Sequence, residues 1–200
     1  ESRIAVIHEA AQDCFCPVND SDLFARTRKK YGISPRFILY AGALDYHKNI
    51  DGLIKAFSRI KDKEAALVLV GVKNDPRYFE SIQRLIADLH LERRVLLLGY
   101  IPQEDLVSLY NMAESVISVS FYEGFGLPVI EAMACAKPVI ASGNTSMAEI
   151  VSDCGILVNP YNLEEITAAM DSLLGDEGLR NSLAEKGFER SKEFSWEKAA

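Results

Sequence analysis

Cysteine and histidine are scarce in this sequence, and neither forms a metal-binding pattern. The four cysteines include one C-x-C pair, Cys14 and Cys16, but no second pair stands at zinc-ligand spacing, and the three histidines are scattered. We therefore expect reduced thiols in a cytoplasmic protein and no metal site. No apolar run approaches the roughly 20 residues of a membrane span, and no signal peptide is visible.

Excess positive charge is also missing, as are several familiar catalytic motifs. The net charge of −7 and the pI near 5.1 argue against a bulk nucleic-acid binder, although a local basic pocket is still compatible with them. G-x-G-x-x-G does not follow the first expected strand, and no P-loop is present, which weakens a dehydrogenase or NTPase interpretation. Neither H-E-x-x-H nor a Ser-His-Asp set is found.

Short apolar runs alternate with amphipathic helical stretches along most of the chain. The runs are continuous rather than alternating, which is typical of strands buried on both faces of a parallel sheet. This pattern predicts an α/β fold, a doubly wound Rossmann-like sheet of six parallel strands in the order 3-2-1-4-5-6. The expected strands are 36–42, 66–71, 94–99, 115–120, 137–142 and 155–159.

Three regions are expected along the chain. Residues 1–34 look like a lead-in from a preceding domain, with a strand "RIAVI", a linker and a short helix that ends at Gly32. Residues 35–193 form the Rossmann-like domain, and 194–200 begin a C-terminal helix. Because the chain opens on Glu1, we expect it to be cut from a longer protein.

The loops after the first and fourth strands are the expected ligand site, because ligands bind where the strand order switches. These loops are "GALDYHKN" and "FYEGFGLP". In the second, Gly124 and Gly126 allow a tight bend, and Pro128 suits the first turn of a helix. The freed amides near Gly126 and Leu127 make an anion site that suits phosphate.

Two glutamates eight residues apart, Glu123 and Glu131, flank this bend. Carboxylates accept hydrogen bonds from sugar hydroxyls, so acids on both sides of a phosphate site suggest a nucleotide sugar. The alternative is that Glu123 is a solvated loop acid and that Glu131 helps to cap the helix.

Four further positions bear on the site. Lys48 precedes Asn49, a plausible N-cap, and can neutralise a diphosphate, although a plain surface lysine is the alternative. Tyr100 and Ile101 are candidates for stacking on a base or for backbone contact with it, and Leu106 can pack there. The same residues also suit a core.

The stretches "LYAGALDYHKNIDGLIKAF", "LVGVKN", "LLGYIPQEDLVSLYNMAESVISVSFYEGFGLPVIEAMACAKPVIAS" and "MAEIVSDCGILVNPYNLEEI" resemble one known family. It is the C-terminal half of GT-B retaining glycosyltransferases, family four, and the resemblance covers about residues 1–193. It implies binding of a nucleotide-sugar donor and retaining hexosyl transfer without a bound metal. It also implies a missing N-terminal domain that supplies the acceptor site, so the chain alone is expected to be inactive.

The resemblance also implies roles for single residues. Glu131 is similar to the glutamate that holds the donor ribose, Glu123 to the one near the sugar hydroxyls, and Lys48 to the diphosphate lysine. Glu123 and Lys48 are the implied catalytic residues. The implied donor-binding residues are Gly42, Lys48, Tyr100, Ile101, Leu106, Glu123, Gly124, Phe125, Gly126, Leu127 and Glu131.

One departure from the family concerns Ala43, which stands where many members have a basic residue. A small residue there resembles some mannosyltransferases of bacterial surface polysaccharide synthesis, which favours GDP-mannose over a UDP-sugar. The expected acceptor is a glycan or a lipid-linked glycan, with peripheral contact to the inner membrane face through the missing domain and no nucleic acid. The alternatives are a GT-B epimerase, a glycan phosphorylase, for which no pyridoxal-lysine motif is visible, and an inactive nucleotide-sugar-binding module.

Overall fold

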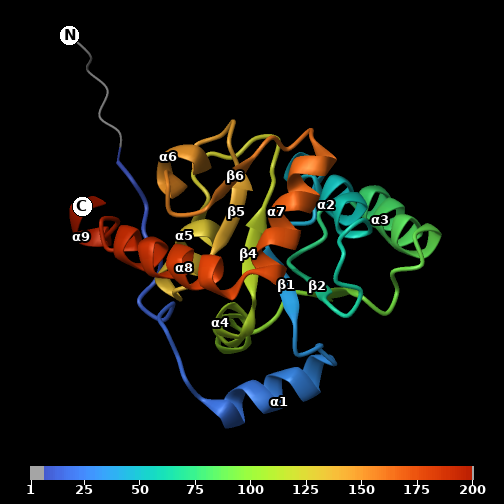
Figure 1. Cartoon of the computed structure of the whole chain (residues 1–200), viewed down its shortest axis with the longest axis horizontal. Coiled ribbons are helices and arrows are strands. Elements are labelled where there is room, and N and C mark those ends of the chain that lie inside the picture. Colours follow the sequence, from blue (N-terminus) through green and yellow to red (C-terminus); the bar gives the residue numbers. More distant parts are fainter. Residues whose placement is uncertain (1–6, 200) are drawn as a thin grey trace.

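Six parallel strands form one sheet in the order β3-β2-β1-β4-β5-β6, which confirms the order predicted from the sequence (Figure 1). The computed structural model describes residues 7–199. Most of the expected strand "RIAVI" therefore lies outside the described residues. The strands are β1 (Phe37–Ala41), β2 (Ala66–Val70), β3 (Val95–Gly99), β4 (Ser115–Ser118), β5 (Val139–Ser142) and β6 (Ile156–Val158).

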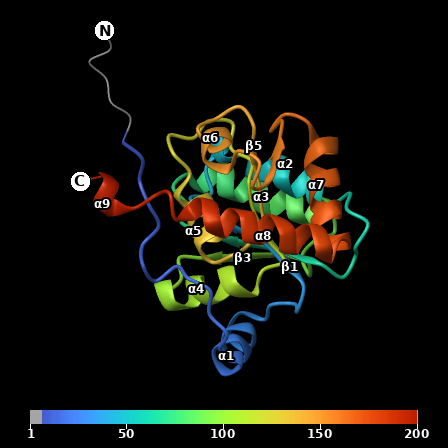
Figure 2. The same ribbon diagram turned by 60° about the vertical axis from the view of Figure 1, so that its left-hand side comes forward.

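Helices cover both faces of the sheet (Figure 2). One face packs on α2, α3 and α7, and the other on α4, α5 and α6. Helix α8 packs against both α5 and α7. The bounds are α1 (Ser21–Tyr31), α2 (Ile50–Phe57), α3 (Pro76–Asp88), α4 (Gln103–Met112), α5 (Leu127–Ala134), α6 (Met147–Val151), α7 (Leu163–Gly175), α8 (Glu177–Ser191) and α9 (Trp196–Ala199), with a short 3₁₀ helix η1 (Tyr46–Lys48).

Strand β1 shows why the apolar runs are continuous. Phe37 and Leu39 enter the core under α4 and α5, whereas Ile38 and Tyr40 enter the core under α2 and α7. All four side chains are buried because successive strand residues point to opposite, equally covered faces.

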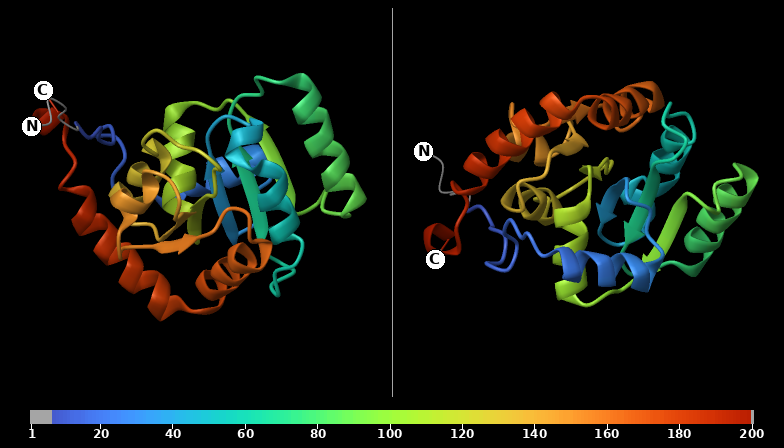
Figure 3. Two further views of the ribbon diagram at one scale, coloured as in Figure 1. Left: turned by 90° about the horizontal axis from the view of Figure 1, so that it is seen from above. Right: turned by 60° about the horizontal axis from the view of Figure 1, so that its bottom comes forward.

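The lead-in segment before α1 is held against α4. Asn111 of α4 accepts from the N–H of Val18 at 2.9 Å and donates to the carbonyl of Cys16 at 3.0 Å. The first described residues of this segment lie beside the C-terminal residues (Figure 3), where the rings of His8 and Phe194 are 5.6 Å apart. The helix α1 ends as predicted at Gly32, whose φ of 64° is left-handed.

Strands β1 and β2 end in two glycines that approach each other closely. A Cβ added to Gly71, whose φ is +152°, would lie 1.7 Å from the carbonyl oxygen of Gly42. The N–H of Gly42 also donates to Val70 at 2.9 Å, so the loop after β1 is fixed against the end of β2. This contact sets the path of the backbone toward the site.

We predict that Gly71→Ala lowers the free energy of unfolding by about 2 kcal/mol or more, since the clash forces the backbone apart. Urea unfolding measures the change. Gly175→Ala is the matched control, because a Cβ there meets no atom within 4 Å. Equal stability of Gly71→Ala and the wild type would contradict the close approach.

Candidate functional site

Lys48 and Glu123 form an ion pair at the carboxyl edge of the sheet. Lys48 Nζ lies 2.6 Å from Glu123 Oε2, and each side chain is only 18% exposed. Lys48 follows β1 and Glu123 follows β4, and these two strands are neighbours at the switch in strand order. The structure thus brings together two residues for which different roles were predicted, Lys48 at the diphosphate and Glu123 near the sugar hydroxyls. A solvated loop acid and an unpaired surface lysine are both excluded by this contact.

The loop that carries Lys48 is anchored at its base. The hydroxyl of the buried Tyr40 donates to the carbonyl of Ala43 at 2.7 Å, and the N–H of Leu44 donates to Val72 at 2.8 Å. Burial raises the pKa of Tyr40 well above its usual value, with nearby Glu123 adding to the effect, so Tyr40 stays a neutral donor. The loop therefore holds its shape up to η1.

Asn49 stands at the N-cap position of α2, as predicted, but it does not cap the helix with its side chain. Asn49 has a left-handed φ of 58°, and its side chain makes no capping hydrogen bond to α2. Its buried amide donates instead to the carbonyls of Val119 at 3.1 Å and Pro160 at 2.8 Å. These two bonds orient the Asn49 side chain, and Asn49 thereby ties the Lys48 loop to the segments after β4 and β6.

A row of aromatic rings joins the same loops from outside. The ring of Phe121 stacks on Tyr161 at 4.8 Å and lies 5.8 Å from Tyr46. The N–H of Phe121 donates to the carbonyl of His47 at 2.8 Å. These contacts fix the backbone on either side of the Lys48–Glu123 pair, and the sequence analysis did not anticipate them.

The glycine-rich bend leads into α5 with its amides free. Gly126 has a φ of 111°, and an added Cβ would lie 2.7 Å from Cγ of Met147, so glycine is required there. Ser146 Oγ lies 3.0 Å from the carbonyls of both Glu123 and Phe125. Within residues 7–199 the N–H groups of Gly126 and Leu127 have no hydrogen-bond acceptor. The bend thus offers donors to an anion, as predicted.

A hollow of about 630 Å³ lies beside this bend. It is lined by the bend from Glu123 to Pro128, by Glu149 of α6 and by His8 of the lead-in segment. His8 Nε2 lies 3.0 Å from Glu149 Oε1, and its ring centroid is 6.0 Å from that of Phe125. The lead-in segment therefore forms one wall of the hollow. The sequence did not predict this role, because the segment is more than 100 residues away from the bend along the chain.

Glu131 is held by a tyrosine rather than by the helix end. The hydroxyl of Tyr110 donates to Glu131 Oε2 at 2.7 Å, and Glu131 makes no capping bond to α5. Burial raises the pKa of the Glu131 carboxyl, and the Tyr110 hydrogen bond opposes this shift. The alternative that Glu131 caps the helix is therefore wrong.

The expected base-binding positions are divided between surface and core. Tyr100 is 83% exposed and lines a hollow of about 450 Å³ with Gly71 and Val72. Ile101 is only 5% exposed and packs in the core, which leaves backbone contact as its available role and excludes stacking of its side chain. Leu106 is half-buried against the same core.

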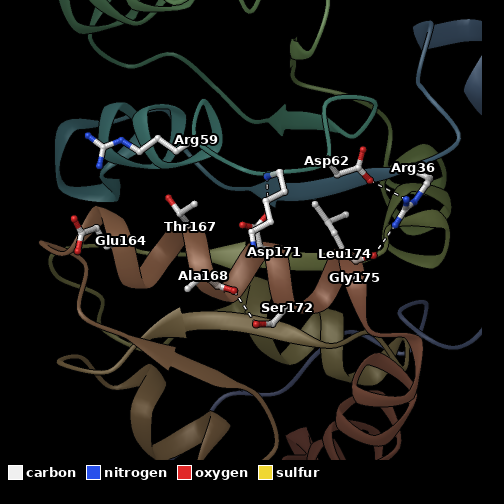
Figure 4. A pocket seen from close by; sticks show the side chains of 11 residues that line it. Arg36, Arg59, Asp62, Glu164, Thr167, Ala168, Asp171, Ser172, Leu174 and Gly175 are labelled. Atoms are coloured by element: carbon white, nitrogen blue, oxygen red, sulfur yellow. Dashed lines mark hydrogen bonds and ion pairs between the residues drawn. The ribbon is translucent and has the colours of Figure 1, made fainter.

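A larger hollow, of about 820 Å³, lies on the other side of the molecule along α7 (Figure 4). Some of its charged groups already have partners within the protein. Arg36 reaches Asp62 at 2.8 Å and the carbonyl of Leu174 at 2.6 Å, and Asp171 accepts from the N–H of Lys61 at 2.8 Å. Arg36 directly precedes β1, so this groove is at the amino ends of the strands, where α/β sheets rarely bind ligands. We therefore place the candidate site at the loops.

Within residues 7–199 no three His, Cys, Asp or Glu side chains gather at metal-binding geometry. The helices in the same range are too short or too polar for any of them to cross a bilayer.

We predict that Lys48 and Glu123 are energetically coupled in the free protein. A double-mutant cycle of Lys48→Ala and Glu123→Ala should give a coupling free energy of about 1–2 kcal/mol, because both side chains are largely shielded from water. The exposed pair Arg84 and Glu80 on α3 is the control, with an expected coupling below about 0.5 kcal/mol. Urea unfolding supplies the energies, and equal coupling in the two pairs would contradict the shielding argument.

Known proteins resemble the chain over most of its length. The family model of "Glycosyl transferases group 1" matches residues 24–190. O-antigen chain mannosyltransferase B of Escherichia coli is 36% identical over 200 residues, which is 98% of this chain and 51% of that protein. The chain thus spans about half the length of this curated relative.

Solved structures agree with the sequence comparison. Sucrose-phosphate synthase of Thermosynechococcus elongatus superposes with a TM-score of 0.82 at 31% identity, over 96% of this chain and 48% of that chain. The C-terminal domain of a glycosyl transferase group 1 protein from Francisella tularensis superposes with a TM-score of 0.80 at 25% identity, over 92% and 97% of the two chains. The fold, the switch-point loops and these matches together place the chain in the glycosyl transferases group 1 family.

Proposed function

We propose that this chain is the donor-binding, C-terminal part of a retaining hexosyltransferase that uses a nucleotide sugar. The observation that carries the proposal is the meeting of Lys48 and Glu123 at 2.6 Å beside the glycine-rich bend that opens α5. A cation, a carboxylate and free helix amides then lie at the strand switch point. A sugar diphosphate needs these three kinds of group.

Lys48 and the helix amides are proposed to bind the diphosphate. Negative charge grows on the leaving diphosphate as the sugar departs, so fixed donors there stabilise the transition state. The N–H groups of Gly126 and Leu127 have no acceptor within the described residues and are aligned by the start of α5. Lys48 supplies the matching positive charge from the facing loop.

Glu123 is proposed to change partners when the donor binds. In the free protein its Oε2 accepts from Lys48 and lies 3.2 Å from Ser120 Oγ. Once the diphosphate takes Lys48, the carboxylate becomes free to accept from sugar hydroxyls, while Ser120 keeps it in place. The ion pair therefore holds both side chains near their working positions before the donor arrives.

Glu131 is proposed to hold the ribose and Tyr100 to contact the base. Tyr110 occupies one oxygen of Glu131, and no described group donates to the other. Tyr100 presents an exposed ring at the loop after β3, next to the close approach of Gly42 and Gly71. Exposed aromatic rings stack on bases.

GDP-mannose is the proposed donor, with a UDP-sugar as the alternative. The curated relative at 36% identity is an O-antigen chain mannosyltransferase, which supports mannose and surface polysaccharide as the substrate class. Its length, about twice that of this chain, supports an acceptor site on a further domain. We expect no metal to take part. An inactive nucleotide-sugar-binding module is the second candidate, favoured by Ala43 at the usual basic position.

A nucleotide panel tests the proposal on this chain. We expect GDP to raise the melting temperature more than UDP or ADP, guanosine to have little effect, and no sugar transfer without the acceptor domain. A preference for UDP would change the donor and keep the function. A folded protein that binds no nucleoside diphosphate at millimolar concentration would contradict the proposal, and sugar transfer by the chain alone would contradict the placement of the acceptor site.

Charge at the first loop should tune diphosphate affinity. We predict that Lys48→Ala weakens nucleoside diphosphate binding about tenfold, because it removes a charge-assisted contact. Ala43→Arg should strengthen binding by about 1 kcal/mol, since the planar guanidinium can bind two phosphate oxygens. Ala43 is half-exposed. Its described hydrogen bond is made by its backbone carbonyl, which accepts from Tyr40, so an arginine side chain at this position would not break it.

Calorimetry at low and at physiological salt measures both changes, and the effect of Ala43→Arg should shrink with salt. Lys55→Ala on α2 is the control, because Lys55 pairs with Asp51 away from the loop. Wild-type affinity of Lys48→Ala at both salt concentrations would show that this lysine does not serve the phosphates.

A further inference from the structure

Tyr110 is a fully buried tyrosine whose hydroxyl has one polar partner within residues 7–199, the carboxylate of Glu131. Its side chain is 0% exposed, and its hydroxyl donates to Glu131 Oε2 at 2.7 Å. Tyr110 lies on α4 and Glu131 on α5, so the contact joins two helices that pack on the same face of the sheet.

The donor role of this hydroxyl is fixed by its surroundings. Burial raises the pKa of Tyr110 well above its usual value, and the negative charge on Glu131 acts in the same direction. The hydroxyl therefore keeps its proton and directs it to the carboxylate. Its ring is braced edge-on by the buried Phe15 of the lead-in segment, with centroids 5.4 Å apart, so the hydroxyl is held in one place.

Glu131 is left with one satisfied and one available oxygen. No group within residues 7–199 donates to its Oε1, although the side chain is half-buried. This oxygen is not among the buried polar atoms that lack a partner in the described residues, so it is open to solvent and accessible to a ligand. The bond from Tyr110 also restricts the rotation of the carboxylate.

We infer that Tyr110 is a positioning residue for the nucleotide: it fixes Glu131 so that the free carboxylate oxygen meets the ribose hydroxyls. The inference rests on the proposed function, in which Glu131 holds the ribose. A tyrosine that served stability alone would affect all nucleotides equally. A positioning tyrosine affects only those that carry ribose hydroxyls.

The test is calorimetric binding of GDP and of 2′,3′-dideoxy-GDP to wild type and Tyr110→Phe. The wild type should prefer GDP by about tenfold or more, the value of a hydrogen bond to a charged group. Tyr110→Phe should lose about tenfold for GDP and less than about twofold for the dideoxy form. Glu131→Gln combined with Tyr110→Phe should lose no more than Glu131→Gln alone.

Tyr31→Phe is the matched control, because Tyr31 donates to Asp105 at the same 2.7 Å but between α1 and α4. It should leave both affinities unchanged. Tyr110→Met fills a similar volume without a hydroxyl and repeats the test if the phenylalanine variant is unstable. Unchanged GDP affinity in a folded Tyr110 variant overturns the inference while the proposed function stands. Equal binding of GDP and dideoxy-GDP by the wild type overturns the ribose assignment and the inference with it.

Discussion

The ion pair of Lys48 and Glu123 is the contact around which the candidate site is organised. A lysine and a glutamate that are both 18% exposed would be unfavourable apart, because each would keep a poorly solvated charge. Their pairing requires the loops after β1 and β4 to hold a fixed separation. Asn49, the Phe121 aromatic contacts and Tyr40 each fix part of that separation.

In the proposed function, the pair also connects the free and the donor-bound forms of the site. Lys48 would leave Glu123 for the diphosphate, and the carboxylate would stay held near Ser120. Because such groups are preorganised, little free energy is needed to rearrange them when the substrate binds. The second glutamate is prepared in another way, by a hydrogen bond from a buried neutral tyrosine.

The sequence allowed the layers and the strand order to be predicted, because continuous apolar runs and short loops leave few arrangements for a parallel sheet. It also allowed the two candidate loops to be predicted, since the switch point follows from the order of β1 and β4. Contacts between distant side chains were out of reach. Asn49 stands at the N-cap of α2 as predicted, but its side-chain amide donates to carbonyls 70 and 111 residues away, and the sequence does not reveal these contacts. The role of the Tyr110 hydroxyl was missed for the same reason, since its partner Glu131 lies on another helix.

The most direct test of the account is a crystal structure of this chain with GDP bound. We predict that the β-phosphate lies between Lys48 Nζ and the amides of Gly126 and Leu127, with the ribose hydroxyls on Glu131 and the Lys48–Glu123 contact opened. GDP bound elsewhere, such as in the groove along α7 (Figure 4), or bound with that ion pair intact, would contradict it.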